Sequence, residues 1–390
     1  MRPLKLQFFL GYSVLGSIAP LLPIYLKEEK GFSESQIGVA MSSWSLALIL
    51  SPAFVTLLAD TRFRPRNILG VALVLTAVFL ACLSLVEGVA LTLLCYALYS
   101  MAYVPTLPLQ DGYYFSSTEG REGVEPYHRI RFFGTLGFIL PSVAFFFLLR
   151  AGFPREVIVY LAMGCCLFAL VNTRFLPPVR KRETAEEAKG KLPSIEALRA
   201  ILHPRARYFC LALVLAAFGS TAYIAYFPLY LREHVAISDA YIGLILNFGP
   251  VLELFFILGL GKLQKLLGLR WLMILGIAGM ALRLFLLALF PGLLTALLVQ
   301  LVHGPEILAL YVLPVMYLNS LASDSFRNSM QGVFTMAVVG LPRLFGHLIS
   351  GWLAEINILW TFTWGGSLAL AAALLLFWRF RPAPLETGTA

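Results

Sequence analysis

Long apolar runs separated by short polar turns occupy most of the chain. A helix that crosses the hydrocarbon core of a bilayer needs about 20 apolar residues. Twelve runs reach that length, and an even number of spans places both ends of the chain on one side of the membrane. The pattern predicts an all-α membrane protein with twelve transmembrane helices at 4–26, 36–59, 67–87, 89–115, 128–150, 155–176, 206–231, 239–262, 268–290, 292–318, 326–352 and 357–380.

Composition and charge agree with a multi-pass protein of the cell membrane. The chain is 59% hydrophobic and 13% charged, whereas soluble domains are about 25% charged. The net charge of +9 comes from basic residues in the turns, so it indicates membrane topology rather than nucleic-acid binding. One set of turns holds 23 of the 30 Lys and Arg residues, and the opposite set holds five. The positive-inside rule therefore predicts that both termini are cytoplasmic.

The chain divides into two similar halves. Residues 177–205 form the one long polar stretch, a predicted cytoplasmic linker between six-helix bundles at 1–176 and 206–390. An offset of 205 residues maps Pro23-Ile-Tyr-Leu26 onto Pro228-Leu-Tyr-Leu231 and Ile37-Gly38 onto Ile242-Gly243. Parallel six-helix repeats with a solute cavity at their interface are typical of one large class of secondary transporters.

Charged side chains inside the second half are the main candidates for chemistry. Inserting a carboxyl side chain at the bilayer centre costs a free energy of about 2.5–3.5 kcal/mol on insertion scales, so such residues usually have a functional role. His303 and Glu306 lie three residues apart, on one face of the span 292–318, and such a pair can hold a proton near neutral pH. Glu253 and Arg283 lie at similar depth on neighbouring spans. We expect Arg283 to pair with Glu306 or Glu253, and these four residues to couple solute movement to protons.

Arg343 and His347 add two ionisable groups to the span 326–352. Arg343 either binds an anionic substrate or neutralises a carboxylate, and His347 is expected to be structural. The alternative for the whole set of intramembrane charges is a static network of ion pairs that only fastens the helices together.

The first half has its own candidate substrate site. Asp111 is near the inner end of one predicted span, and Arg129 and Arg131 begin the next, so Asp111 can meet an arginine there. The alternative is a surface ion pair that fixes the intervening loop. Aromatic residues of three spans are expected to line the cavity or to pack in the core: Tyr12, Tyr99, Tyr103, Tyr223 and Tyr226.

A charged cluster after the second predicted span and the five cysteines complete the set of candidate residues. Asp60, with Arg64 and Arg66, ends the second predicted span, and we expect this cluster to control helix packing on the cytoplasmic face.

The five cysteines lie in apolar runs without metal-site spacing, so we expect no metal or cofactor. An intramembrane enzyme would need a nucleophile or a motif such as His-Glu-x-x-His, which the sequence lacks.

These residues resemble the lactose permease (oligosaccharide:proton symporter) branch of the major facilitator superfamily and its neighbouring phenylpropionate-permease and nucleoside:proton symporter branch. His303-Gly-Pro-Glu306 has the His-x-x-Glu spacing of helix 10 in that branch, and Arg283 stands where its helix 9 arginine would. Glu253 resembles the helix 8 acid, displaced by about one turn.

Helices 4 and 5 carry the same resemblance. The segment 127–138 resembles the helix 5 signature, in which Arg131 would bind substrate and Phe138 would stack on it. Asp111 resembles the acidic partner of that arginine. The resemblance covers nearly the whole chain. Its departures include Thr56, where the superfamily motif usually has glycine, and the added Arg343 and His347.

The resemblance implies a monomeric, proton-coupled symporter that moves a sugar, nucleoside or aromatic acid by alternating access. Its partners would be protons, one small solute and membrane lipid. Two readings of the same fold stay open, a proton-driven exporter and a lipid or lysolipid carrier. A sensor is disfavoured because the chain has no soluble domain to report binding.

Overall fold

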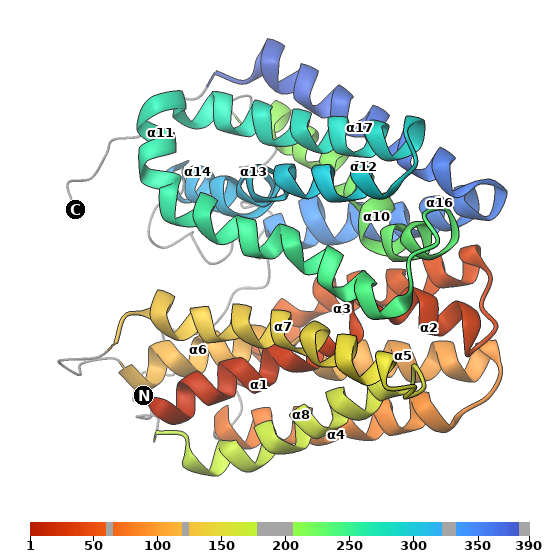
Figure 1. Cartoon of the computed structure of the whole chain (residues 1–390). Coiled ribbons are helices and arrows are strands. Elements are labelled where there is room, and N and C mark those ends of the chain that lie inside the picture. The colour runs from red at the N-terminus through yellow and green to blue at the C-terminus, as the bar shows by residue number, and fades with distance from the viewer. Residues whose placement is uncertain (60–64, 119–124, 178–205, 322–332, 382–390) are drawn as a thin grey trace. The chain divides into compact units, whose positions relative to one another are not determined.

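The computed structural model describes residues 1–59, 65–118, 125–177, 206–321 and 333–381 (Figure 1). Every regular element in these ranges is helical, which confirms the predicted all-α class. The helices gather into two compact units, Met1–Gly190 with Ile237–Asn247, and Lys191–Ala236 with Phe248–Ala390. The predicted linker 177–205 lies almost entirely outside the described residues.

The first unit is organised around α1, which packs against α6, α7 and α8. The expected first span is bent by 40° between α1 and α2, where Pro20 and Pro23 interrupt regular helix bonding. The helices of this unit are α1 (Arg2–Ile18), α2 (Leu22–Glu28), α3 (Glu34–Ala59), α4 (Pro65–Leu85), α5 (Val89–Tyr103), α6 (Thr106–Thr118), α7 (Tyr127–Arg150), α8 (Val157–Asn172) and the 3₁₀ turn η1 (Thr173–Phe175).

The second unit is organised around α10, which packs against α16 and α17. Its elements are α10 (Arg207–Glu233), α11 (Asp239–Leu289, whose first turns belong to the first unit), α12 (Leu293–Leu298), the 3₁₀ turn η2 (Val299–Val302), α13 (His303–Ile307), the π-helical η3 (Leu308–Val312), α14 (Leu313–Leu321), the π-helical η4 (Phe334–Gly340), α16 (Leu341–Ile356) and α17 (Ile358–Arg379).

Helix α11 contains two of the predicted spans. Its 51 residues would extend roughly 77 Å as one straight helix, more than twice the hydrocarbon thickness. Gly268 breaks it with φ 70° and ψ 165°, a conformation that glycine adopts without steric penalty. The break separates the segment that carries Glu253 from the segment that carries Arg283.

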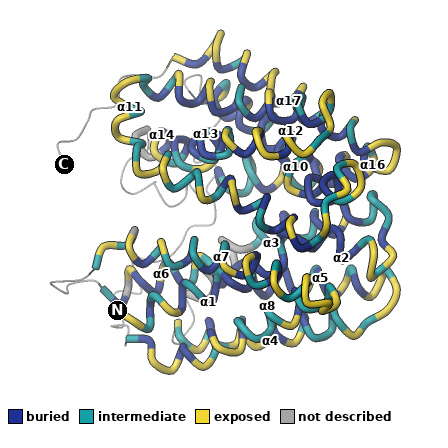
Figure 2. The backbone as a smooth tube through the Cα atoms, in the orientation of Figure 1, coloured by how far each residue is buried: buried dark blue, intermediate teal, exposed yellow. Residues whose placement is uncertain are grey.

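The outer faces of the helices carry the apolar surface that lipid requires. Along α4, Val71 is 60% exposed while Leu73 on the opposite face is fully buried, and Figure 2 shows the same alternation of buried and exposed turns on other helices. In the described residues, nine helices are long and apolar enough to cross a membrane, or ten if α1 and α2 form one span. The total of twelve spans and the cytoplasmic termini remain predictions.

Candidate functional site

An ion pair in the second unit forms the centre of the candidate site. Arg283 on α11 is 1% exposed, and its Nη1 lies 2.7 Å from Oε2 of Glu306 on α13. Isolating either charge in the bilayer would be costly, so each group lowers the cost of burying the other. The expected pairing of Arg283 with one of two glutamates is therefore confirmed for Glu306.

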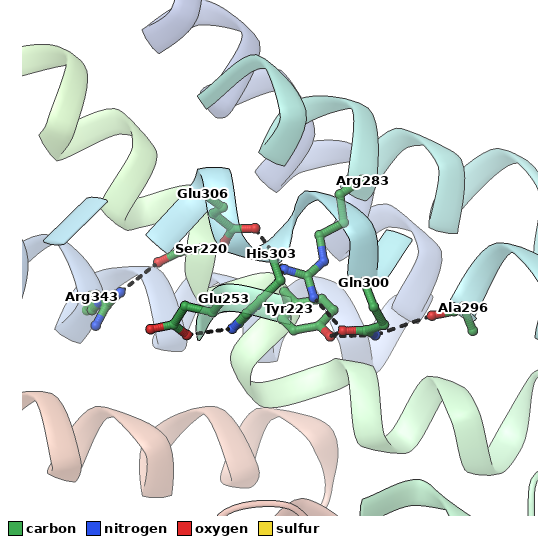
Figure 3. Close-up of polar contacts among 9 residues, drawn as sticks. All are labelled: Ser220, Tyr223, Glu253, Arg283, Ala296, Gln300, His303, Glu306 and Arg343. Atoms are coloured by element: carbon green, nitrogen blue, oxygen red, sulfur yellow. Dashed lines mark hydrogen bonds and ion pairs between the residues drawn. The ribbon is translucent and has the colours of Figure 1, made fainter. Parts of the chain in front are cut away.

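A tyrosine and a glutamine complete the surroundings of Arg283 (Figure 3). The guanidinium carbon lies 3.3 Å from the ring centroid of Tyr223 on α10, in a cation–π contact. Nη2 of Arg283 donates to Oε1 of Gln300 at 3.2 Å, and the Gln300 amide donates to the Tyr223 hydroxyl at 3.0 Å. The amide also donates to the Ala296 carbonyl at 3.2 Å, which fixes its orientation.

His303 lies between Arg283 and the second carboxylate. Its Nδ1 is 3.4 Å from Nη1 of Arg283, and its Nε2 is 3.5 Å from Oε2 of Glu253. A guanidinium has only donors, so Nδ1 of His303 accepts in this contact. A neutral imidazole then carries its proton on Nε2, facing Glu253. The four residues predicted for proton coupling are thus brought together in one chain of contacts.

Two close helix approaches hold this chain of contacts in place. A Cβ on Gly276 would lie 2.4 Å from the carbonyl oxygen of Pro305, so only glycine lets the second half of α11 approach α13 this closely. A Cβ on Gly249 would lie 2.8 Å from Cγ of His303. Glycine therefore lets each half of α11 reach the segment that carries His303 and Glu306.

The span that carries this segment is less regular than its apolar pattern predicts. It is one apolar stretch, Leu293–Leu318, but it changes from α to 3₁₀, back to α and then to π geometry. Pro305 has no backbone N–H to continue the ladder. Short 3₁₀ and π segments inside helices often occur at functional sites.

Arg343 lies apart from the Arg283–Glu306 pair (Figure 3). Its Nη2 donates to the Tyr311 hydroxyl and, at 3.4 Å, to the Ser220 hydroxyl. Its guanidinium carbon is 5.1 Å from the Tyr311 ring centroid. His347, one turn further along α16, is buried, and its Nδ1 has no partner among the described residues.

The candidate site of the first unit is arranged differently from the expectation. Asp111 accepts a hydrogen bond from the Tyr127 hydroxyl at 2.8 Å, and no arginine of the described residues forms an ion pair with it. Arg131 instead lies over the ring of Tyr12, 4.1 Å from its centroid. Arg129 is exposed, and neither arginine forms the expected ion pair with Asp111 in the described part of the chain.

The other predicted residues are more dispersed. Phe138 on α7 is half-buried. Tyr103 is fully buried and donates to the Gly11 carbonyl at 2.8 Å, and Tyr226 is likewise fully buried. Arg66 lies in the first turn of α4, whereas Asp60 and Arg64 lie outside the described residues.

Three contacting residues had no role assigned from sequence: Gln300, Ser220 and Tyr311. Gln300 precedes His303 by one turn, so its place beside the charged pair could have been inferred from spacing. Ser220 and Tyr311 are uncharged and give no comparable signal in an apolar run. Tyr223 was expected only to line a cavity or pack in the core, and it is the direct partner of Arg283.

Comparison with known proteins gives one consistent picture. The family model described as "MFS_1 like family" matches residues 1–364. The nucleoside permease NupG of Escherichia coli (strain K12) is 24% identical over 99% of this chain and 97% of that permease. The xanthosine permease of the same organism is 24% identical over 89% of this chain and 86% of that permease.

Solved structures agree on the fold. The crystal structure of the nucleoside transporter NupG superposes with a TM-score of 0.84 at 20% identity, covering 98% of this chain and 99% of that one. The two relatives named above are permeases rather than enzymes.

Proposed function

Because the chain belongs to the MFS_1 like family and is a multi-pass membrane transporter of small solutes, we propose that it imports a nucleoside or a related organic solute together with a proton, by alternating access. The relatives named as nucleoside and xanthosine permeases favour a nucleoside over a sugar or an aromatic acid. The observation that carries the proton coupling is the buried pair of Arg283 and Glu306, extended by His303 to Glu253.

Protonation of Glu306 would change the charge balance of this site. The pair is neutral when Glu306 is ionised, whereas a protonated Glu306 leaves Arg283 buried with only neutral partners. An unpaired buried charge destabilises a conformation by several kcal/mol. A proton that binds to Glu306 therefore shifts the protein towards the conformation in which Arg283 is better solvated or paired.

Each unit has its own proposed solute contacts. In the first unit they are Arg131, whose guanidinium lies on Tyr12, with Asp111, Arg129, Phe138 and Tyr103. In the second unit they are Arg343 and Tyr226, together with Glu253, whose side chain is 24% exposed. The Asp60, Arg64 and Arg66 cluster would control the conformational change.

Uptake by purified protein in vesicles tests the proposal. Glu306→Gln should abolish solute accumulation driven by an inward proton gradient, while solute exchange without a gradient persists. Glu87→Gln, at an exposed carboxylate between α4 and α5, is the matched control and should accumulate solute normally. Gradient-driven accumulation that is unchanged in Glu306→Gln would falsify the coupling role. Accumulation only under an outward proton gradient would indicate an exporter.

A further inference from the structure

Arg343 is an intramembrane cation without a carboxylate partner in the described part of the chain. No glutamate or aspartate oxygen of these residues lies within ion-pair distance of its guanidinium. The two intramembrane glutamates of the candidate site are already engaged, Glu306 by Arg283 and Glu253 by His303. A charge at membrane depth almost always has a partner, so Arg343 is poised for one supplied from outside.

Most of the hydrogen-bonding capacity of Arg343 is unused. A guanidinium has five N–H donors, and the contacts with Tyr311 and Ser220 both involve Nη2. Nε of Arg343 is buried, and neither Nε nor Nη1 has a hydrogen-bond partner among the described residues. The free donors suit a planar group with two oxygens, which a guanidinium binds in bidentate geometry.

The local backbone supports a binding role rather than a packing role. Tyr311 belongs to the π-helical η3, and Arg343 lies in the first turn of α16, three residues after the π-helical η4 ends at Gly340. Two π segments therefore flank one guanidinium, and such segments often occur at functional sites. Ser220 is 2% exposed and already donates to the Ala217 carbonyl at 2.8 Å, so its oxygen is held in position.

Proton binding would make this site more attractive to an anion. With His303 neutral, the charges of Arg283, Arg343, Glu306 and Glu253 sum to zero. One added proton on either carboxylate leaves the set with a charge of plus one. Anion binding at Arg343 would restore neutrality, so proton and anion would favour each other's binding.

We propose that Arg343, with Ser220 and Tyr311, binds a delocalised negative charge on the transported solute, such as the ionised base of an oxopurine nucleoside or a carboxylate. This inference rests on the proposed transport function and adds a substrate class to it. It predicts that the protein prefers anionic solutes to neutral ones of similar size.

Xanthosine and inosine provide matched probes, because the base of xanthosine ionises near neutral pH and that of inosine does not. We would measure uptake of each at mildly alkaline pH in vesicles of zwitterionic phosphatidylcholine. Wild type should favour xanthosine. Arg343→Gln should lower the xanthosine-to-inosine ratio about tenfold, the effect of losing one hydrogen bond to a charged group. Arg343→Lys should retain most of the ratio, and Lys262→Gln, at an exposed cation of α11, should leave it unchanged.

The remaining outcomes separate the sources of the anion and the causes of failure. Benzoate that competes with uptake in wild type and not in Arg343→Gln would support a carboxylate ligand. Equal uptake of both nucleosides by wild type, or an unchanged ratio in folded Arg343→Gln, would overturn the inference while leaving nucleoside transport intact. An Arg343 effect seen only with phosphatidylglycerol would overturn it in favour of a lipid headgroup. Transport of no solute at all would overturn the proposed function itself.

Discussion

Each unit places an arginine over a tyrosine of its first helix, yet the two pairs differ in how their charge is balanced. Arg283 lies 3.3 Å from the Tyr223 ring centroid and also binds a carboxylate at 2.7 Å. Arg131 lies 4.1 Å from the Tyr12 ring centroid, is half-buried and has no ion pair among the described residues. The same two residue types therefore form a neutralised core element in one unit and an available cation in the other.

The difference follows from burial. A fully buried guanidinium must have a counter-charge, because the free-energy cost of its desolvation exceeds the stabilisation that a cation–π contact provides. A half-buried guanidinium keeps part of its hydration, so a ring contact of about 0.5–2 kcal/mol can stabilise it without an ion pair inside the protein, and its remaining donors stay available to a ligand. Substitutions in the second unit should accordingly cost more stability than their counterparts in the first.

The largest expected effect comes from separating Arg283 and Glu306. Either Arg283→Gln or Glu306→Gln leaves a buried charge unpaired and should destabilise the protein by about 3–5 kcal/mol. The double variant removes both charges and should recover part of that loss. Unfolding of the purified protein in detergent measures all three. Single variants as stable as wild type, or a double variant less stable than either single one, would contradict the view of this pair as a neutralised core element.

A smaller loss of stability is expected when a tyrosine hydroxyl is removed, and it should differ between Tyr223 and Tyr12. Tyr223→Phe keeps the ring but removes the hydroxyl that bonds Gln300, so it should cost about 1–3 kcal/mol. The Tyr12 hydroxyl has no hydrogen-bond partner among the described residues, and Tyr12→Phe should be nearly neutral. Thermal unfolding of both variants checks the contrast, and equal shifts would show that the Gln300 contact contributes nothing.

The regular part of the fold could be predicted from sequence because lipid fixes the length of a spanning helix. The expected spans 128–150 and 206–231 correspond to Arg129–Arg150 and Arg207–Glu233. Hydropathy alone does not show the bend after α1, which is marked instead by Pro20 and Pro23. The π segments η3 and η4 could not be predicted, because no hydropathy pattern distinguishes them from regular α-helix. Five ranges, including most of the predicted linker, lie outside the described residues.

Charged members of the candidate site could also be predicted, since an ionised group in an apolar run is conspicuous. The partner of Asp111 could not be predicted, because a tyrosine hydroxyl competes with arginine for the carboxylate. The sequence does not show which of the two groups binds it. Ser220 and Tyr311 were missed for the related reason that neutral polar residues are common in membrane helices.

The hydrogen bond from Tyr127 is expected to hold Asp111 away from Arg131, so that Arg131 stays available to the solute. Breaking the Asp111–Tyr127 contact tests this expectation. Tyr127→Phe removes the hydroxyl that donates to Asp111, and loss of this partly buried bond should cost about 1 kcal/mol. The freed carboxylate would then be able to turn towards Arg131. We expect weaker solute binding in this variant, measured by equilibrium binding of labelled nucleoside. Phe115→Leu, which alters a ring stacked on Tyr127, is the packing control and should bind solute normally.

The smallest effect is expected at a third arginine, outside the spans, where solvent replaces lipid. Arg155 contacts Glu28 and Glu29 at 2.6 Å each, and also Asp239, but its side chain is 23% exposed. Exposed ion pairs contribute about 0–1 kcal/mol and weaken with salt, so Arg155→Gln should lower stability only slightly, and less at high salt. Partial burial lowers the pKa of Arg155, but hydrogen bonds to Asp239 and Glu29 outweigh this and raise the pKa above its ordinary value. A pKa that is higher in the folded protein than in the unfolded chain adds to the free energy of unfolding. This contribution is fully present below the ordinary pKa of arginine and is lost only as the pH rises above it. The difference between wild type and Arg155→Gln should therefore stay constant from neutral pH to about pH 10, and a loss comparable to that of Arg283→Gln would show that burial does not set the cost.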